Sequence, residues 1–236
     1  MRILCVVPAR GGSKGVRRKN LRDVAGKPLL VWTVEQALAA RPAMDVVVST
    51  DDAEIADVAR AAGALVPFLR PAELARDETP TEPVVRHAIA AAREADAAPD
   101  AVVLLQATSP VRHQGTLSRA LAQFSASGVD SLVGVVPQAP FIWTDGAEPS
   151  AAYDVTARPR RQDLTPEALR YRETGSLYVT RPWVYDELDN RIGGRVGLFV
   201  MDELEGIDVD TELDLDVADA TLRRLLAAPS STGTPA

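Results

Sequence analysis

Short apolar runs alternate with amphipathic stretches along most of the chain. The runs at 3–7 (ILCVV), 45–49 (DVVVS) and 101–106 (AVVLLQ) are rich in β-branched residues, which is typical of strands covered on both faces. Stretches with helical spacing lie between them, at 28–40, 51–62, 81–95 and 114–127. This alternation predicts an α/β fold, a three-layer α/β/α sandwich around a mostly parallel, Rossmann-like sheet.

The rest of the chain continues this pattern, with one interruption. Further strands are expected at 64–68, 131–136, 175–180 and 195–201, and a last helix at 211–227. Asp51 or Asp52 is the expected N-cap of the second helix, and Gly63 its C-cap. Pro, Arg and polar residues dominate after 137, so we interpret 138–172 as an insertion within a single domain spanning 1–228. Residues 229–236 (PSSTGTPA) have the composition of a disordered tail.

Composition excludes several classes of protein. The 236 residues are 46% hydrophobic, which suits one domain with a sizeable core. No apolar run is long enough to span a membrane, and the N-terminus does not resemble a signal peptide. The single Cys5 excludes an internal disulfide, and the net charge of -7 argues against binding to duplex nucleic acid. We therefore expect a cytoplasmic protein.

The use of lysine is uneven. Of 26 basic residues, 23 are Arg and 3 are Lys, at positions 14, 19 and 27. In a chain with such a preference for Arg, a retained Lys indicates a need for a compact ammonium rather than a planar guanidinium.

Two of these lysines lie in a glycine-rich loop after the first strand. Gly11, Gly12 and Gly15 allow a ligand to approach the backbone closely. The positive charges around them are Arg10, Lys14, Arg17, Arg18 and Lys19. A chain of phosphates at the carboxyl end of the strand is the ligand that this pattern favours. Neither a Walker A loop nor a G-x-G-x-x-G fingerprint fits, and a solvated basic loop is the alternative.

Two acidic residues near the C-terminus form a second candidate site. Asp208 and Asp210 alternate with Val209, so an extended backbone places both carboxylates on one side. Such a pair suits a divalent cation that also contacts phosphate oxygens. The alternative is that Asp210 only caps the helix that follows.

The loop PARGGSKGVRRKN resembles the signature of the acylneuraminate cytidylyltransferases, or CMP-sialic acid synthetases. Further segments resemble that family in order over about residues 2–220: LRDVAGKPLLVWTV, STDDAEIADVARAAGA, FLRPAELARDETPT, LLQATSPVR, RRQDL, YRETGSLYVT and GIDVDTELDLDVA. The resemblance implies a sheet of the nucleotide-diphospho-sugar transferase type. It also implies that CTP and a nine-carbon α-keto acid sugar give a CMP-sugar and pyrophosphate, with Mg2+ as cofactor and Mn2+ as the alternative.

The resemblance also assigns roles to residues. Those implied in catalysis are Arg10, Lys14, Asp208 and Asp210, with Asp208 and Asp210 as ligands of one or two metal ions. Those implied in nucleotide binding are Ala9, Arg10, Gly11, Gly12, Ser13, Lys14, Lys19, Asn20, Arg70 and Thr81. Those implied in sugar binding are Gln106, Arg161, Gln162, Thr174 and Gly175. For Arg70 the alternative is an ordinary loop residue before a proline, and the role of Lys27 is left open.

In the family, a segment like 138–172 makes a homodimer and sends basic side chains towards the partner's active site. The candidates here are Arg158, Arg160 and Arg161, and the stretch PFIW (140–143) would supply apolar contact. A flexible surface loop is the alternative. The sequence departs from the family where many members carry a Lys near 140–143, and where Thr174 replaces the usual Asn before Gly175.

Two other functions are left open: a transferase for an eight-carbon keto-deoxy sugar, and a catalytically silent nucleotide-binding module. Within the implied function, the sugar is undecided among N-acetylneuraminic, deaminated, legionaminic and pseudaminic acids.

Overall fold

The structure is a computed structural model that describes residues 1–227, so the predicted tail at 229–236 lies outside the described residues. Its main sheet has six strands in the order β10-β6-β9-β5-β1-β4. They are β1 (Ile3–Pro8), β4 (Asp45–Ser49), β5 (Ala101–Leu105), β6 (Ser131–Gln138), β9 (Arg170–Thr180) and β10 (Val196–Val200). β9 runs antiparallel to both of its neighbours, and the other pairings are parallel. The expected mostly parallel sheet is confirmed.

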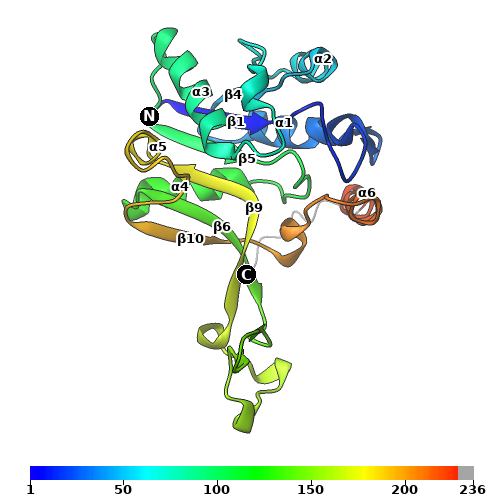
Figure 1. Ribbon diagram of the computed structural model, residues 1–236, viewed down its shortest axis with the longest axis vertical. Helices are drawn as coiled ribbons and strands as arrows, with labels where there is room; N and C mark the ends of the chain where they lie inside the picture. The colour runs from blue at the N-terminus through cyan, green and yellow to red at the C-terminus, as the bar shows by residue number, and fades with distance from the viewer. Residues whose placement is uncertain (228–236) are drawn as a thin grey trace, which may run out of the picture.

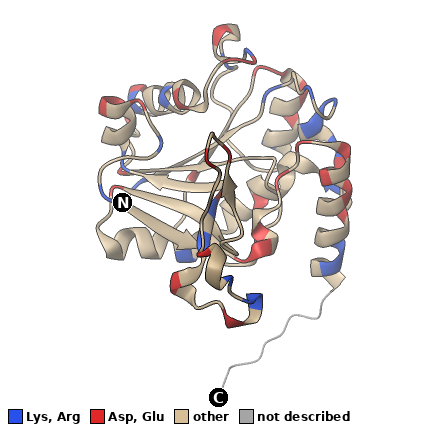
Figure 2. Cartoon of the chain, turned by 60° about the horizontal axis from the view of Figure 1, so that its bottom comes forward, with Lys and Arg blue, Asp and Glu red and all other residues tan. Residues whose placement is uncertain are grey.

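Helices cover both faces of this sheet (Figure 1). One face packs against α1 (Leu29–Ala39), α2 (Ala53–Ala61) and α4 (Thr116–Ser127), and the other against α3 (Thr81–Glu94) and α5 (Pro182–Leu188). Along β1, Cys5 packs on the face covered by α1, α2 and α4, whereas Leu4 and Val6 pack on the face covered by α3 and α5. The strands are largely free of charge, and acidic and basic residues are interspersed over helices and loops (Figure 2). The predicted three-layer sandwich is therefore confirmed.

A third apolar cluster fixes the last helix beside the glycine-rich loop. Helix α6 (Glu212–Ala227) packs on α1 and on a small hairpin of β2 (Asp23–Val24) and β3 (Lys27–Pro28). Thr211 caps α6, because its Oγ1 accepts a hydrogen bond from Asp214 N at 3.2 Å and its own N–H donates to Asp214 Oδ2 at 2.8 Å. The idea that Asp210 caps this helix is therefore wrong, and its carboxylate instead accepts a hydrogen bond from Lys19 Nζ.

Two strand predictions need correction. The segment 64–68 pairs with the sheet only through a bridge between Val47 and Leu65, so no full strand forms there. β9 begins at Arg170 rather than 175, because it continues its pairing with β6 as far as Gln138 beyond a bulge. Polar residues dominate this extension, which hides its strand character from a pattern search.

The predicted insertion forms an arm that projects from the sheet between β6 and β9 (Figure 1). It contains β7 (Trp143–Thr144), β8 (Ser150–Ala151) and short 3-10 turns, η3 (Val155–Ala157), η4 (Arg161–Asp163) and η5 (Pro166–Ala168). The other 3-10 turns are η1 (Lys19–Leu21), η2 (Ala72–Leu74) and η6 (Glu203–Gly206). Within residues 1–227, none of the helices has the length and apolarity needed to cross a membrane.

Candidate active site

A cleft of about 410 Å³ opens where β1 and β5 end. Four segments that lie far apart in the sequence meet around it: the glycine-rich loop, the segment 70–84 leading into α3, the turn after β5, and Asp210 before α6. Ligands in open α/β sheets bind at this edge, because the loops that follow the strands converge there.

The glycine-rich loop is fixed by its neighbours. Ala9 N donates to Ser49 O at 2.9 Å, and Gly11 N donates to Asp51 Oδ1 at 3.0 Å. A Cβ added to Gly15 would lie 2.1 Å from the backbone oxygen of Asp210, so glycine is required for the loop to approach the acidic segment this closely. The structure thus brings the glycine-rich loop into contact with the segment that carries Asp208 and Asp210.

Arg10 and Lys14 point to a common partner in the cleft. The NH1 of Arg10 lies 2.6 Å from Asp77 Oδ1, and the Nζ of Lys14 lies 2.7 Å from Asp77 Oδ2. Lys14 and, to a lesser extent, Arg10 hold the pKa of the Asp77 carboxyl below its ordinary value. Arg10 and Lys14, the side chains predicted to bind phosphate, are therefore close enough for one oxyanionic group to contact both.

Lys19 and Asn20 connect the loop to the acidic segment. Lys19 Nζ donates to Val209 O at 2.6 Å and lies 3.0 Å from Asp210 Oδ1. Asn20 Nδ2 donates to Arg10 O at 3.0 Å. Both residues line the cleft as predicted, and both also hold its walls together.

Asp208 and Asp210 flank Val209, which is buried in the third apolar cluster. Asp210 is 76% exposed and lines the cleft, whereas Asp208 Oδ1 accepts a hydrogen bond from Ser109 Oγ at 3.2 Å. Among residues 1–227, no three His, Cys, Asp or Glu side chains gather into a ready metal site. Asp208 lies outside the lining of the cleft, so Asp210 is the carboxylate of the pair that faces it. Mg2+ is commonly held by one or two carboxylates together with water and substrate phosphates, which one carboxylate at the cleft can satisfy.

The predicted nucleotide residues Arg70 and Thr81 form the wall opposite the loop. Arg70 is buried, and its Nε donates to Ser49 Oγ at 3.2 Å while its NH2 donates to Ser49 O. Burial lowers the pKa of the Arg70 guanidinium. Arg70 is therefore an internal support of this wall rather than an ordinary exposed loop residue. Ser13 also lines the cleft, whereas Ala9, Gly11 and Gly12 lie outside its lining.

The predicted sugar residues separate into two groups. Gln106 lines the cleft, and Gly175 lies against it, since a Cβ added at its φ of +72° would be 3.0 Å from Gln106 Oε1. The Thr174 hydroxyl donates a hydrogen bond to Gly134 O at 3.1 Å, so it connects β9 to β6 within the sheet. Arg161 and Gln162 lie on η4 of the arm, outside this cleft. Arg161 instead lines a second cavity of about 380 Å³ at the base of the arm.

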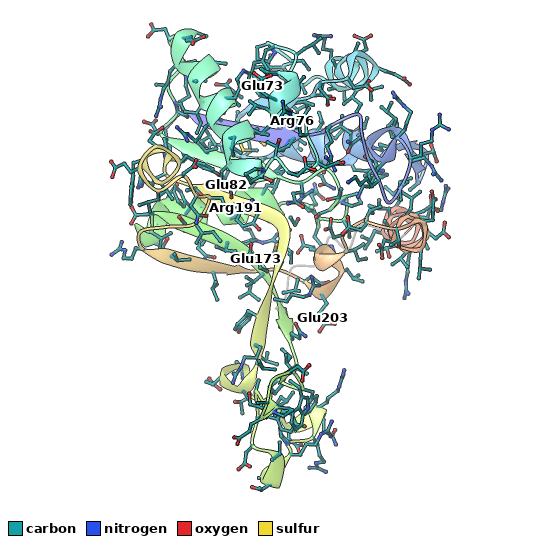
Figure 3. All side chains as sticks on the ribbon, viewed as in Figure 1. Glu73, Arg76, Glu82, Glu173, Arg191 and Glu203 are labelled. Carbon is teal, nitrogen blue, oxygen red and sulfur yellow. The ribbon has the colours of Figure 1, made fainter. Side chains whose placement is uncertain are left out.

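The polar and charged residues Arg76, Asp77 and Thr79 are among the cleft residues that were not predicted. They lie on the segment between η2 and α3, where Figure 3 labels Arg76, with Glu73 of η2 close by in the chain. The signal for them was the block FLRPAELARDETPT, but an acidic residue is not expected beside a polyanion. Lys27 is accounted for by a salt bridge to Glu35 and by its position 4.0 Å over the Trp32 ring.

A cation-lined cleft at the carboxyl edge of a Rossmann-like sheet is typical of proteins that bind a phosphate-bearing ligand. Residues 4–157 match the family described as cytidylyltransferase. Two curated relatives extend the match along nearly all of the chain. The chain is 32% identical over 223 residues to the pseudaminic acid cytidylyltransferase of Campylobacter jejuni subsp. jejuni serotype O:2, covering 92% of this chain and 95% of that protein. It is also 32% identical over 228 residues to N-acylneuraminate cytidylyltransferase A of Danio rerio, covering 94% of this chain and 51% of that protein.

The chain therefore belongs to the cytidylyltransferase family, as a nucleotidyltransferase of the acylneuraminate type. A solved structure of CMP:2-keto-3-deoxy-manno-octonic acid synthetase complexed with CTP shares the fold, with a TM-score of 0.70 and 17% identity, covering 95% of this chain and 100% of that chain.

Proposed function

We propose that this protein transfers CMP from CTP to a nine-carbon α-keto acid sugar, a nonulosonic acid, and releases pyrophosphate. The observation that carries the proposal is the arrangement of one cleft, which holds Arg10 and Lys14 together with Gln106 and Asp210. The names of the two relatives, which specify a pseudaminic acid and an N-acylneuraminate, support a nonulosonic acid as the acceptor.

Arg10 and Lys14 bind the triphosphate in this proposal. Their shared contact with Asp77 shows that both can reach one oxyanion at hydrogen-bond distance. Charge builds on the oxygen between the α- and β-phosphates as pyrophosphate leaves, so cations at this position stabilise the transition state more than the ground state. The exposed ammonium of Lys14 can follow the leaving group, because its flexible stem carries a compact charge.

The acceptor end of the cleft lies at Gln106 and the acidic segment. The anomeric hydroxyl attacks the α-phosphorus, the bond to the bridging oxygen breaks, and one of the two carboxylates accepts the hydroxyl proton. Asp208 and Asp210 would also hold Mg2+, which when bound neutralises phosphate charge. Lys19 Nζ lies 3.0 Å from Asp210 Oδ1 and orients that carboxylate.

The nucleoside fits the wall formed by Asn20, Arg70 and Thr81. All three lie on the cleft, and they offer an amide, a guanidinium and a hydroxyl, which are suitable for the polar edge of a pyrimidine. Because Arg70 is itself held by Ser49, this wall is fixed before the nucleotide arrives.

A homodimer in which the arm reaches the partner's cleft is part of the proposal. Within the arm, Arg158 lies 4.2 Å over the Phe141 ring and Arg160 pairs with Asp163 at 2.5 Å. Among the described residues, no carboxylate lies within salt-bridge distance of Arg161, which leaves it as the arm cation suited to a substrate carboxylate across the interface. Trp143 is 55% exposed and is suited to apolar contact with the partner.

The second candidate is transfer to an eight-carbon keto-deoxy sugar, which is favoured only by the shared fold of the octonic acid synthetase. A pyrophosphate-release assay with CTP and Mg2+ separates the two when it is run over a panel of nonulosonic acids and one eight-carbon acid. We expect release with at least one nonulosonic acid and none with the shorter sugar. Release with the eight-carbon acid alone would support the second candidate. No release with any acceptor would support a silent nucleotide-binding module.

A further inference from the structure

Arg112 is a buried cation that the proposed chemistry does not use. It follows the turn Thr108–Val111 after β5, and only 6% of the residue is exposed. Within residues 1–227, no carboxylate oxygen lies within salt-bridge distance of its guanidinium. Burial lowers the pKa of Arg112 to about 10, which leaves it protonated at neutral pH. Glu205 and Asp208 act on this charge only from beyond salt-bridge distance. A buried charge without a direct ionic contact is unfavourable for stability, so its presence calls for an explanation.

The guanidinium joins three elements of the fold. Its NH1 donates to Thr33 Oγ1 at 3.2 Å and to Gln36 Oε1 at 2.9 Å, both on α1. Its NH2 donates to Gln106 O at 3.4 Å and to Ser176 O at 2.7 Å, which lie just beyond β5 and within β9. A planar group with several fixed donors can make such a connection, whereas a single ammonium cannot.

The position of these two carbonyls explains what the connection does. Pairing between β5 and β9 ends at Leu105 and Leu177, so Gln106 and Ser176 would form the next pair if the strands stayed together. The strands separate there, and Arg112 binds both carbonyls in place of the missing rung. Directly beyond this point the Gln106 side chain meets Gly175. The guanidinium therefore fixes the width of the opening in which Gln106 lies.

The same turn also supports the acidic segment. Ser109 Oγ donates to Asp208 Oδ1 at 3.2 Å, and Val209 N donates to Thr108 O at 2.8 Å. The turn between Gln106 and Arg112 is thus held to the sheet by Arg112, and to the segment of Asp208 and Val209 by Thr108 and Ser109. A displacement of this turn would move the acceptor end of the cleft, while Arg10 and Lys14 are held by other contacts.

We propose that Arg112 is a positioning residue for the acceptor sugar: its guanidinium holds the separated ends of β5 and β9 so that Gln106 faces the sugar hydroxyl and the turn that supports the acidic segment keeps its place. This inference rests on the proposed function for the identity of the acceptor. A purely structural role would lower the stability of the fold without separating the two substrates, because loss of the guanidinium leaves buried acceptors such as Ser176 O unpaired.

Arg112→Met tests this directly, because it keeps an unbranched side chain and removes the charge and the donors. We expect the KM for the sugar to rise by about tenfold or more and kcat to fall, while the Kd for CTP stays within about twofold. The KM for the sugar and the kcat of Arg112→Lys should be closer to those of Arg112→Met than to those of the wild type. Arg119→Met removes an exposed cation from α4 and is the matched control, with kinetics like those of the wild type.

Two further measurements separate positioning from folding and from substrate identity. The thermal midpoint of Arg112→Met should fall, because buried acceptors lose their donor, but a loss of stability alone would weaken CTP and sugar binding alike. Hydrogen exchange should increase in peptides covering 105–109 and 174–177, but not in β1. Equal losses of CTP and sugar affinity, or exchange that increases throughout the sheet, would overturn the proposal. If the wild type transfers CMP to none of the acids tested, the proposed function fails, and the exchange result still decides whether Arg112 holds the two strand ends.

Discussion

The carboxylate of Asp77 bridges Arg10 and Lys14, with its two oxygens 2.6 and 2.7 Å from NH1 and Nζ. This carboxylate occupies the two cations that bind the triphosphate in the proposed function. Because Lys14 and Arg10 lower the pKa of Asp77, it stays ionised throughout the neutral range and competes with phosphate there. In the proposed function, nucleotide binding therefore displaces Asp77, and the same group returns when pyrophosphate leaves.

Replacing Asp77 by Asn should tighten nucleotide binding. The amide keeps the shape of the side chain but removes the competing charge, so we expect the KM for CTP and the inhibition constant of pyrophosphate to fall by roughly two- to fivefold. Glu78→Gln, which neutralises the exposed neighbour, should change neither constant. A higher KM for CTP in Asp77→Asn would show that Asp77 assists the site instead of competing for it. Steady-state kinetics at neutral pH are sufficient for this comparison.

Lys14 should not be replaceable by Arg, although the charge is the same. The wider guanidinium would change the geometry of its contact with the phosphates, so we expect about a tenfold or greater loss of kcat/KM in Lys14→Arg. Lys14→Ala should lose on the order of 10²- to 10³-fold, mainly in kcat, as is typical when one stabilising donor is removed. Circular dichroism should show an intact fold, because Lys14 is 74% exposed. Near-normal turnover in either variant would contradict its role.

Asp210→Ala tests the metal assignment. The variant should lose roughly 10²-fold or more of its activity, and the remaining activity should no longer depend on Mg2+. Asp216→Ala is the control, since Asp216 is an exposed carboxylate further along α6. Its Mg2+ titration should match that of the wild type. A titration of Asp210→Ala that also matches the wild type would remove Asp210 from the metal site.

The contact between Gly15 and the backbone of Asp210 predicts a steric effect. Gly15→Ala must push the loop away from the acidic segment, because its Cβ would lie 2.1 Å from the Asp210 oxygen. A displacement of about 1 Å at reacting groups costs about 10²-fold in rate. We therefore expect kcat/KM to fall by that order, together with a lower thermal midpoint. Gly12→Ala is the control for stability, since nothing lies within 4 Å of its added Cβ. Equal thermal midpoints for the two variants would refute the steric explanation.

Local signals in the sequence were sufficient for much of the fold. The apolar run of β1 predicted a strand covered on both faces, and the polar residue before α2 predicted its cap. Asp52 does accept hydrogen bonds from Glu54 N and Ile55 N. The polar extension of β9 was missed, because its strand character comes from pairing with β6 and not from its own residues.

The candidate site was predictable where chemistry and position coincide in one loop, as for Arg10, Lys14 and Lys19. Asp77 and Arg112 were not predictable in the same way. Asp77 has the opposite sign to the one expected beside a polyanion, and it is brought to the cleft only by the tertiary fold. Arg112 is an Arg in a chain rich in Arg, and its burial depends on three elements that are distant in sequence.

Quantifying both products of one reaction tests the central claim most directly. The purified protein would be incubated with CTP, Mg2+ and each nonulosonic acid, and pyrophosphate and the CMP ester of the sugar would be measured together. We expect equal amounts of the two products with at least one sugar, and neither product when CTP, sugar or metal is omitted. Pyrophosphate formed without a CMP ester, or no product with any nonulosonic acid, would contradict the proposed transfer.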